Sequence, residues 1–313
     1  MSDELEFEHE DRRRSALFGW PLLVALLSCL ALILAAAFAP KLLPRLDLRT
    51  MVLAGAGTGL ALWLLVLLAG SRTRQWLVVG GALLVLPLTG ALAGLGAGRI
   101  YVARASIDAQ TFAEVDLAAD GKPSVPGAAE HRGVASAAYL AAIREADADE
   151  RAYAEAMGKF NLGVLSSPYL LQQAPQVLAD CASISSLERV AQDHGSRARA
   201  RAARLVAAID RSELPAETRP GARKIVTAGD ADAMLANRIE IIRASRAQCE
   251  LLARRTWHNA AGYFGFSSGG DRGRFGETTR RLLEAAGDAE ALQRAAKDQR
   301  IAGREAVREA LMR

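Results

Sequence analysis

Charged residues are missing from three long stretches of this sequence. No Asp, Glu, Lys or Arg occurs in residues 15–39, 50–70 or 75–98, where Leu, Val, Ile and Ala dominate. Each stretch is longer than the about 20 apolar residues that a helix needs to cross a hydrocarbon core of roughly 30 Å. This absence excludes an ordinary soluble globular protein. It predicts three transmembrane helices within residues 15–100, preceded by a polar tail over residues 1–14, and makes the lipid bilayer an expected partner.

Ionisable side chains are therefore absent from the predicted spans, which contain many glycines. Ion and proton pathways depend on intramembrane charges, so their absence argues against transport or proton pumping. Spacings of four residues separate Gly55 from Gly59, Gly90 from Gly94, and Gly94 from Gly98. Small residues at this spacing lie on one helix face and allow helices to approach closely. Self-association of the chain through these glycine-rich faces is one expected consequence.

Motifs of catalysis and metal binding are also missing. The three cysteines include no Cys-x-x-Cys pair, which excludes zinc-ribbon and thioredoxin-like sites. No His-Glu-x-x-His or Walker motif occurs, and Glu-x-x-His occurs only at Glu6 and His9, in the polar tail. We therefore expect neither an enzyme nor a bound metal or cofactor.

A surplus of basic charge is lacking in the polar part of the chain. After Arg104 there are 29 Lys and Arg against 28 Asp and Glu, whereas nucleic-acid binding needs clustered excess positive charge. No nucleic-acid partner is expected. Of the 39 basic residues 34 are Arg, and Ala is abundant, which is typical of a GC-rich bacterial genome.

Membrane orientation depends on the charges that flank the spans. Five basic residues fall on each side, so the positive-inside rule alone does not decide it. Three consecutive arginines, residues 12–14, precede the first span and favour a cytoplasmic N-terminus and a periplasmic C-terminal domain in a bacterial inner membrane. The alternatives are a lipoprotein signal ending at Cys29 and cleavage after Ala39, but the apolar run is long and Pro40 follows.

The residues after Tyr101 have helical periodicity and predict an all-α fold. Residues 101–133 read as a stalk and linker, with a loop over residues 120–133 that is rich in Gly and Pro. Residues 134–313 predict an antiparallel bundle of about four long helices. The expected helices cover about residues 134–160, 177–209, 221–263 and 282–311, with a further helix start at Ser167 and Pro168.

Cys181 and Cys249 lie on the apolar stripes of two successive predicted helices. They are either two buried free thiols or a disulfide between helices, which forms in an oxidising compartment such as the periplasm. In the chain-entropy model, a loop of this length stabilises the fold by roughly 4 kcal/mol.

Two surface features are candidates for contacts with a partner. Residues 265–276 form a glycine-rich loop in which Phe266 and Phe275 flank Arg272 and Arg274, either to dock a partner or as a plain flexible linker. A second candidate is one helix face that contains Arg197, Arg201 and Arg204. Such a face is commonly just solvated, and the alternative is contact with an acidic partner or lipid headgroups.

Two histidines are candidates for a catalytic role. His194 lies on an apolar stripe beside Asp193, as a hydrogen-bonded core histidine does, and His258 follows Trp257 without an identifiable partner. The leading hypothesis is a non-enzymatic inner-membrane protein whose bundle mediates protein–protein interaction or envelope assembly. The alternatives are a bundle that senses or binds a small molecule and, third, a membrane-anchored enzyme.

Overall fold

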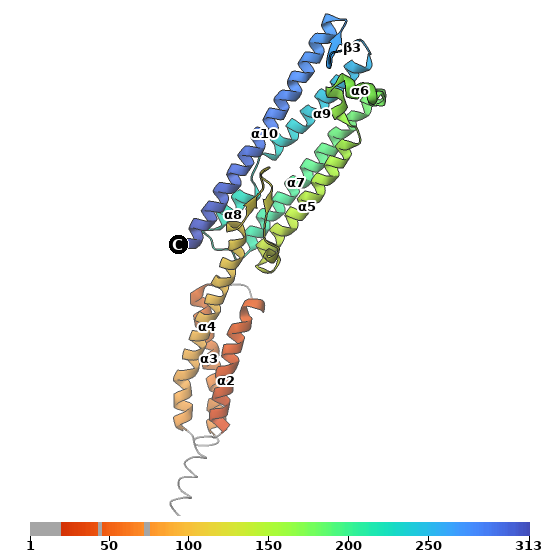
Figure 1. The fold of residues 1–313 in the computed structure, drawn as a ribbon. Coiled ribbons are helices and arrows are strands. Elements are labelled where there is room, and N and C mark those ends of the chain that lie inside the picture. The colour runs from red at the N-terminus through yellow and green to blue at the C-terminus, as the bar shows by residue number, and fades with distance from the viewer. Residues whose placement is uncertain (1–19, 43–45, 72–75) are drawn as a thin grey trace, which may run out of the picture. The chain divides into compact units, whose positions relative to one another are not determined.

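The computed structural model describes residues 20–42, 46–71 and 76–313 (Figure 1). The predictions for the tail over residues 1–14, including Glu6, His9 and the three arginines, lie outside the described residues. The chain forms two compact units, Met1–Ala105 and Ser106–Arg313.

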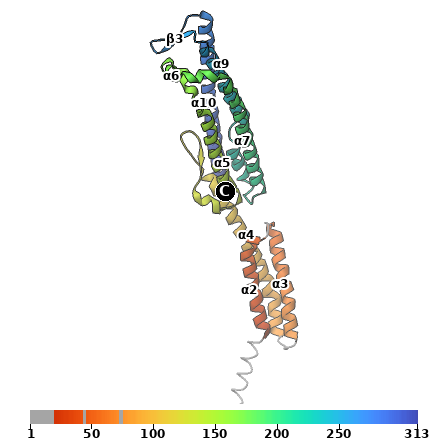
Figure 2. The same cartoon turned by 90° about the vertical axis from the view of Figure 1, so that its right-hand side faces the viewer.

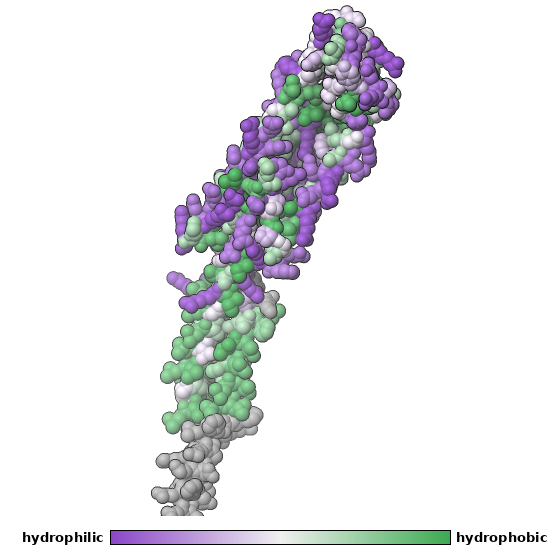
Figure 3. Space-filling view, in the orientation of Figure 1, coloured by the Kyte–Doolittle hydropathy of each residue, from purple (hydrophilic) through white to green (hydrophobic). Residues whose placement is uncertain are grey.

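The first unit consists of apolar helices. They are α2 (Trp20–Leu42), α3 (Leu48–Ser71) and residues 76–105 of α4 (Trp76–Ala113). Within the described residues, three helices are long and apolar enough to cross a membrane, which confirms the predicted spans. Large apolar side chains cover their outer surface (Figure 3), and Leu77 is 94% exposed. Apolar surface of this extent is typical of contact with lipid.

Glycines bring the backbones of α3 and α4 together. A Cβ on Gly55 would overlap the carbonyl oxygen of Gly90, and a Cβ on Gly90 would overlap that of Gly55. Gly59 lies in the same way against the backbone of Leu86, and Gly94 against that of Met51. Four of the glycines on the predicted faces therefore make a contact within one chain. Self-association stays a prediction.

Polar side chains of the first unit donate hydrogen bonds to backbone carbonyl oxygens of neighbouring helices. The indole Nε1 of Trp63 donates to the carbonyl oxygen of Val79 at 3.0 Å, which joins α3 to α4. The guanidinium of Arg104 donates to the carbonyl oxygen of Pro40 at 2.8 Å, near the C-terminus of α2. A cation is favourable there because the last carbonyls of a helix lack partners within the helix.

The second unit is an antiparallel bundle, as predicted. Its long helices are α5 (Val134–Gly158), α7 (Ser186–Arg211), α9 (Ala231–Ala253) and α10 (Gly269–Met312), and each runs back along the one before it (Figures 1 and 2). Shorter elements connect them: α6 (Pro168–Gln173), α8 (Arg219–Val226), and the 3₁₀ segments η1 (Gly127–His131), η2 (Leu162–Ser166) and η3 (Pro175–Ser185). The all-α class is therefore confirmed.

Two short hairpins interrupt the helical pattern. β1 (Asp116–Leu117) pairs with β2 (Pro123–Ser124), inside the stretch predicted as stalk and linker. β3 (Trp257–Ala260) pairs antiparallel with β4 (Tyr263–Phe266). The second hairpin turns through Ala261 at φ 53° and Gly262 at φ 96°. Two consecutive positive φ values match the right-handed twist of a tight hairpin.

Three boundaries differ from the sequence prediction. The helix predicted over residues 177–209 is the 3₁₀ segment η3 followed by α7, because Asp180 leaves the helical region at φ −133°. The helix predicted to reach Tyr263 ends at Ala253, before Arg255 turns to φ 55° and begins the hairpin. The predicted loop over residues 265–276 is wrong: it contains the end of β4 and the first turns of α10.

The N-terminus of α10 explains why those glycines are helical. The Ser268 hydroxyl accepts a hydrogen bond from the backbone N–H of Asp271 at 3.3 Å and caps the helix. The Asp271 carboxylate in turn accepts from the Thr256 hydroxyl at 2.9 Å. A cap and a carboxylate in the first turn stabilise a helix start and offset the low helix propensity of glycine.

The predicted cysteine pair forms a disulfide. Cys181 lies in η3 and Cys249 in α9, with their Cα atoms 5.6 Å apart. Both are buried in an apolar cluster with Ile184, Ile242 and Leu252. The bond therefore ties the 3₁₀ segment η3 to the core helix α9.

A buried carboxylate caps α5 from a distance. The α5 N-cap residue, Gly133, has no side chain, and Asp108 of α4 takes its place. The Asp108 carboxylate accepts from the backbone N–H of Ser136 at 2.7 Å and from that of Ala135 at 3.2 Å. A Cβ at Gly133 would overlap the Asp108 side chain, so glycine is required there.

We expect Asp108→Ala to destabilise the second unit by about 2–3 kcal/mol, because two buried N–H groups lose a charged acceptor. The change is measured as the denaturation midpoint of the full chain. Asp116→Ala is the matched control, because the Asp116 carboxylate accepts only from the neighbouring Leu117 N–H on the exposed surface. Equal midpoints for the two variants would contradict the capping role.

Candidate functional site

The helices of the second unit line a half-open cavity of about 470 Å³. This volume is within the range of small-molecule sites, which are mostly apolar with a few polar groups. Its walls come from α5, α7, α8, α9, α10 and the β1–β2 connection. Small side chains leave much of the space: Ala142, Ala146, Ala198, Ala202, Ala231 and Ala296.

Tyr139 and Arg300 line one end of the cavity. The Tyr139 side chain is 3% exposed and stacks on Phe112 with ring centroids 5.3 Å apart. Among the described residues its hydroxyl has no hydrogen-bond partner. Burial raises the pKa of Tyr139, and the nearby positive charge of Arg300 opposes that rise. A buried hydroxyl without a partner is rare in proteins and is typical of a site that a ligand or water completes.

Arg300 is a cation without an acidic partner in the described chain. Its guanidinium donates to the carbonyl oxygen of Gly121 at 3.2 Å and forms no ion pair with any described carboxylate. Burial lowers the pKa of Arg300. Lys122 lies at the same end, but it is exposed and pairs with Asp120 at 3.5 Å. One partly buried positive charge therefore remains uncompensated at this end of the cavity.

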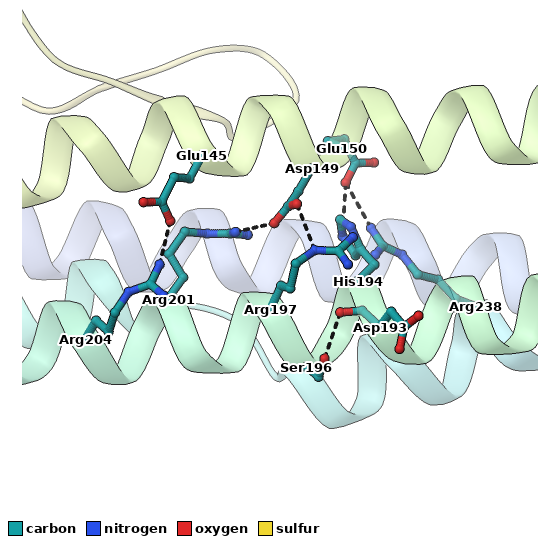
Figure 4. A network of polar contacts seen from close by, with 10 residues as sticks. All are labelled: Glu145, Asp149, Glu150, Asp193, His194, Ser196, Arg197, Arg201, Arg204 and Arg238. Atoms are coloured by element: carbon teal, nitrogen blue, oxygen red, sulfur yellow. Dashed lines mark hydrogen bonds and ion pairs between the residues drawn. The ribbon is translucent and has the colours of Figure 1, made fainter.

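The other end of the cavity is a closed polar cluster (Figure 4). The Glu150 carboxylate of α5 lies 3.4 Å from Nε2 of His194 and 3.3 Å from the Arg238 guanidinium. Arg238 also lies 4.7 Å from the centroid of the Tyr153 ring. The charges at this end compensate one another, which contrasts with the single cation at Arg300.

His194 is buried in this cluster and only 6% exposed. Burial and the positive charge of Arg238 lower its pKa, although Glu150 opposes them, so the imidazole is neutral at neutral pH. Its Nδ1 has no hydrogen-bond partner among the described residues. The sequence predicted a satisfied core histidine. The structure places His194 in the core but leaves one ring nitrogen without a partner.

The arginine face predicted to meet an acidic partner finds that partner in the same chain. Arg197 and Arg201 both pair with Asp149 of α5, the first at 2.9 Å, and Arg204 pairs with Glu145 at 2.5 Å (Figure 4). The two pairs with Asp149 lower the pKa of that carboxyl against the effect of burial. The face joins α7 to α5, and its three arginines share the two carboxylates of Asp149 and Glu145.

The residues of the predicted contact loop lie in an aromatic cluster instead. Phe266 is buried, and the centroids of the Phe266 and Phe275 rings are 5.2 Å apart. Arg272 donates to the carbonyl oxygen of Phe266 at 3.3 Å, and Arg274 lies 4.0 Å from the Asp271 carboxylate. Both phenylalanines thus stabilise the hairpin and the start of α10, and only the arginines are exposed.

His258 is exposed on the hairpin, apart from the cavity. It is paired with Gly265 across the strands, and a Cβ on that glycine would overlap the imidazole. Among the described residues, no group of three or more His, Cys, Asp or Glu side chains could hold a metal.

Sequence reasoning missed the residues that define the cavity. Nothing in the local sequence pattern singles out Tyr139, Arg238 or Arg300. A usable signal was present, because alanines recur at intervals of four on α5 (Ala142, Ala146) and α7 (Ala198, Ala202). Facing stripes of alanine fill less space than Leu or Ile would, and so can leave a void between helices.

Comparison of the chain with protein-family models, with curated proteins and with solved structures finds no match. The function is therefore argued from the cavity and its polar groups.

Replacing Tyr139 by phenylalanine is expected to stabilise the ligand-free chain by about 1 kcal/mol, because the buried hydroxyl lacks a partner. Thermal unfolding of the full chain measures the effect. Tyr153→Phe is the control, because Tyr153 is partly exposed. A clear loss of stability in Tyr139→Phe would show that the hydroxyl has a partner in the folded protein.

Proposed function

We propose that the second unit is a ligand-binding domain, which the three apolar helices anchor to a bacterial inner membrane. The observation that supports it most strongly is the cavity. It combines apolar walls with two buried atoms that lack partners among the described residues, the Tyr139 hydroxyl and His194 Nδ1, and with the Arg300 cation, which has a carbonyl partner but no carboxylate there. Unpaired polar groups in a folded core are destabilising, and they are retained where a ligand completes them. This is the small-molecule hypothesis that ranked second from the sequence.

We place this domain in the periplasm, with the N-terminus in the cytoplasm. The disulfide between Cys181 and Cys249 supports an oxidising compartment, since cytosolic thiols are kept reduced. The test is a protease site appended at the C-terminus. Cleavage in intact spheroplasts supports the periplasmic placement, and cleavage only after the membrane is opened overturns it.

Ligand binding is tested with a fluorescent apolar anion, anilinonaphthalene sulfonate, added to the full chain in lipid nanodiscs. The blocking variant Ala202→Phe fills the cavity, while Ala203→Phe places the same side chain on the exposed face of α7 as a control. We expect saturable fluorescence from the wild type and from Ala203→Phe, above that of empty nanodiscs, and none from Ala202→Phe. Equal signals from all three proteins would refute the proposal.

Protein–protein interaction, the leading hypothesis from the sequence, stays a second candidate. An exposed apolar patch favours it: Tyr169 and Leu170 of α6 and Tyr263 of the hairpin, the last 78% exposed. Pull-down from membranes with the wild type and with the variant Tyr169→Ser/Tyr263→Ser tests it. A partner that binds equally to the wild type and to the variant would show that this patch is not its binding site. The third hypothesis, an enzyme using His194 or His258, is tested by His→Ala replacement.

A further inference from the structure

We propose that the cavity takes an elongated amphiphile with a single carboxylate, whose head group binds at Arg300 and whose hydrocarbon chain lies along the alanine-lined middle. This inference rests on the proposed function and specifies its ligand. The cavity, its charge distribution and its length each support it.

The charge distribution of the cavity favours an anionic head group and predicts that this group lies at the Arg300 end. At one end Arg300 has a carbonyl partner but no described carboxylate, and the hydroxyl of Tyr139 beside it is free to donate. At the other end Glu150, His194 and Arg238 already form a cluster, and the Asp147 carboxylate lies nearby in the wall. A guanidinium and a phenol are both hydrogen-bond donors, and together they suit a carboxylate. Hydrogen bonds in which one partner is ionised are roughly twice as strong as those between neutral groups. The lining cations Arg201 and Arg238 are already in ion pairs with Asp149 and Glu150, whereas Arg300 is not paired with any described carboxylate.

The middle of the cavity suits a hydrocarbon chain. Much of the wall there consists of alkyl side chains that offer no hydrogen bonds, and the polar Arg201 that lies among them is paired with Asp149. The alkyl side chains are Ala142, Ile143, Ala146, Ala198, Ala202 and Met234. A ligand that is polar throughout would lose hydration in this region without compensation. An apolar chain gains about 25 cal/mol per Å² of surface that it buries.

The length of the cavity sets the length of the ligand. Its lining residues on α5 run from Tyr139 to Glu150, and on α7 from Leu205 back to His194. Eleven residues at about 1.5 Å of helix rise give a cavity roughly 16 Å long. A medium-length alkyl chain with one head group fits this length.

The inference is tested by calorimetry on the full chain in lipid nanodiscs, with empty nanodiscs as the blank for partitioning. The probes are decanoate, decanol and decylammonium, which share a chain and differ in the head group. Decanoate is expected to bind tightest and decylammonium weakest. In Arg300→Gln, decanoate affinity should fall about tenfold or more, while decanol affinity stays unchanged.

Arg308→Gln is the matched control. Arg308 lies two turns further along α10 and also donates to a backbone carbonyl, that of Ala113 at 2.8 Å, but it does not line the cavity. This variant should bind decanoate as the wild type does. If Arg300→Gln fails to fold, Tyr139→Phe replaces it, and it should weaken decanoate several-fold without affecting decanol.

The outcomes separate this inference from the proposed function. Decanol or decylammonium binding as tightly as decanoate, or decanoate binding that survives both Arg300→Gln and Tyr139→Phe, overturns the anionic ligand but leaves a binding cavity. Absence of saturable binding for all three probes and for anilinonaphthalene sulfonate overturns the proposed function as well.

Discussion

Replacing Gly90 by leucine is expected to prevent the normal packing of the membrane helices. The Gly90 Cα faces the carbonyl group of Gly55, so any side chain meets backbone atoms that cannot rotate away. Overpacking of a rigid contact destabilises by about 3 kcal/mol or more. The temperature at which the detergent-extracted full chain aggregates should fall sharply, and much less of the protein should be recovered from membranes.

Gly96→Leu is the matched control for this experiment. Gly96 lies on the same helix, and a Cβ added there would meet no atom within 4 Å. It makes the same change in composition and hydropathy, but on a face that is open. Similar losses in Gly90→Leu and Gly96→Leu would show that the contact between α3 and α4 does not hold the spans together.

Removal of the disulfide should produce the largest change in the second unit. The bond joins residues 68 positions apart, and closing such a loop stabilises the folded state by about 4 kcal/mol in the chain-entropy model. For a domain of this size, the double variant Cys181→Ala/Cys249→Ala should unfold on the order of 10 °C lower. Thermal unfolding followed by circular dichroism measures the shift.

Dithiothreitol provides the internal control. It should lower the unfolding temperature of the wild type and of Cys29→Ser, the variant of the cysteine in α2, which is free. It should not affect the double variant. If the reductant leaves the wild type unchanged, the two thiols are not bonded in the protein as it is made.

The membrane spans could be predicted from composition because the requirement is simple. About 20 consecutive uncharged residues suffice to identify a span, and no knowledge of neighbouring segments is needed. The proximity of the two cysteines could be predicted for a similar reason, since helical periodicity alone places Cys181 and Cys249 on the inward-facing stripes. The start of α7 and the end of α9 were harder to predict from the sequence. They depend on the backbone angles of single residues, Asp180 and Arg255.

The cavity and the start of α10 were beyond the reach of local patterns. Glycines near residue 270 indicate a loop by propensity, and only the cap by Ser268 and the contact of Asp271 with Thr256 make them helical. The void arises because alanines from several helices face one another. Such an arrangement depends on segments more than 150 residues apart, which no window of sequence can contain.

The basic side chains of α10 have a consequence for the order of folding. Arg300, Arg304 and Arg308 donate to the carbonyl oxygens of Gly121, Val115 and Ala113, across separations of 179 to 195 residues. Contacts of such high sequence separation form late, because a long chain must close first. During translation the segment that follows the third span would therefore emerge long before its partners.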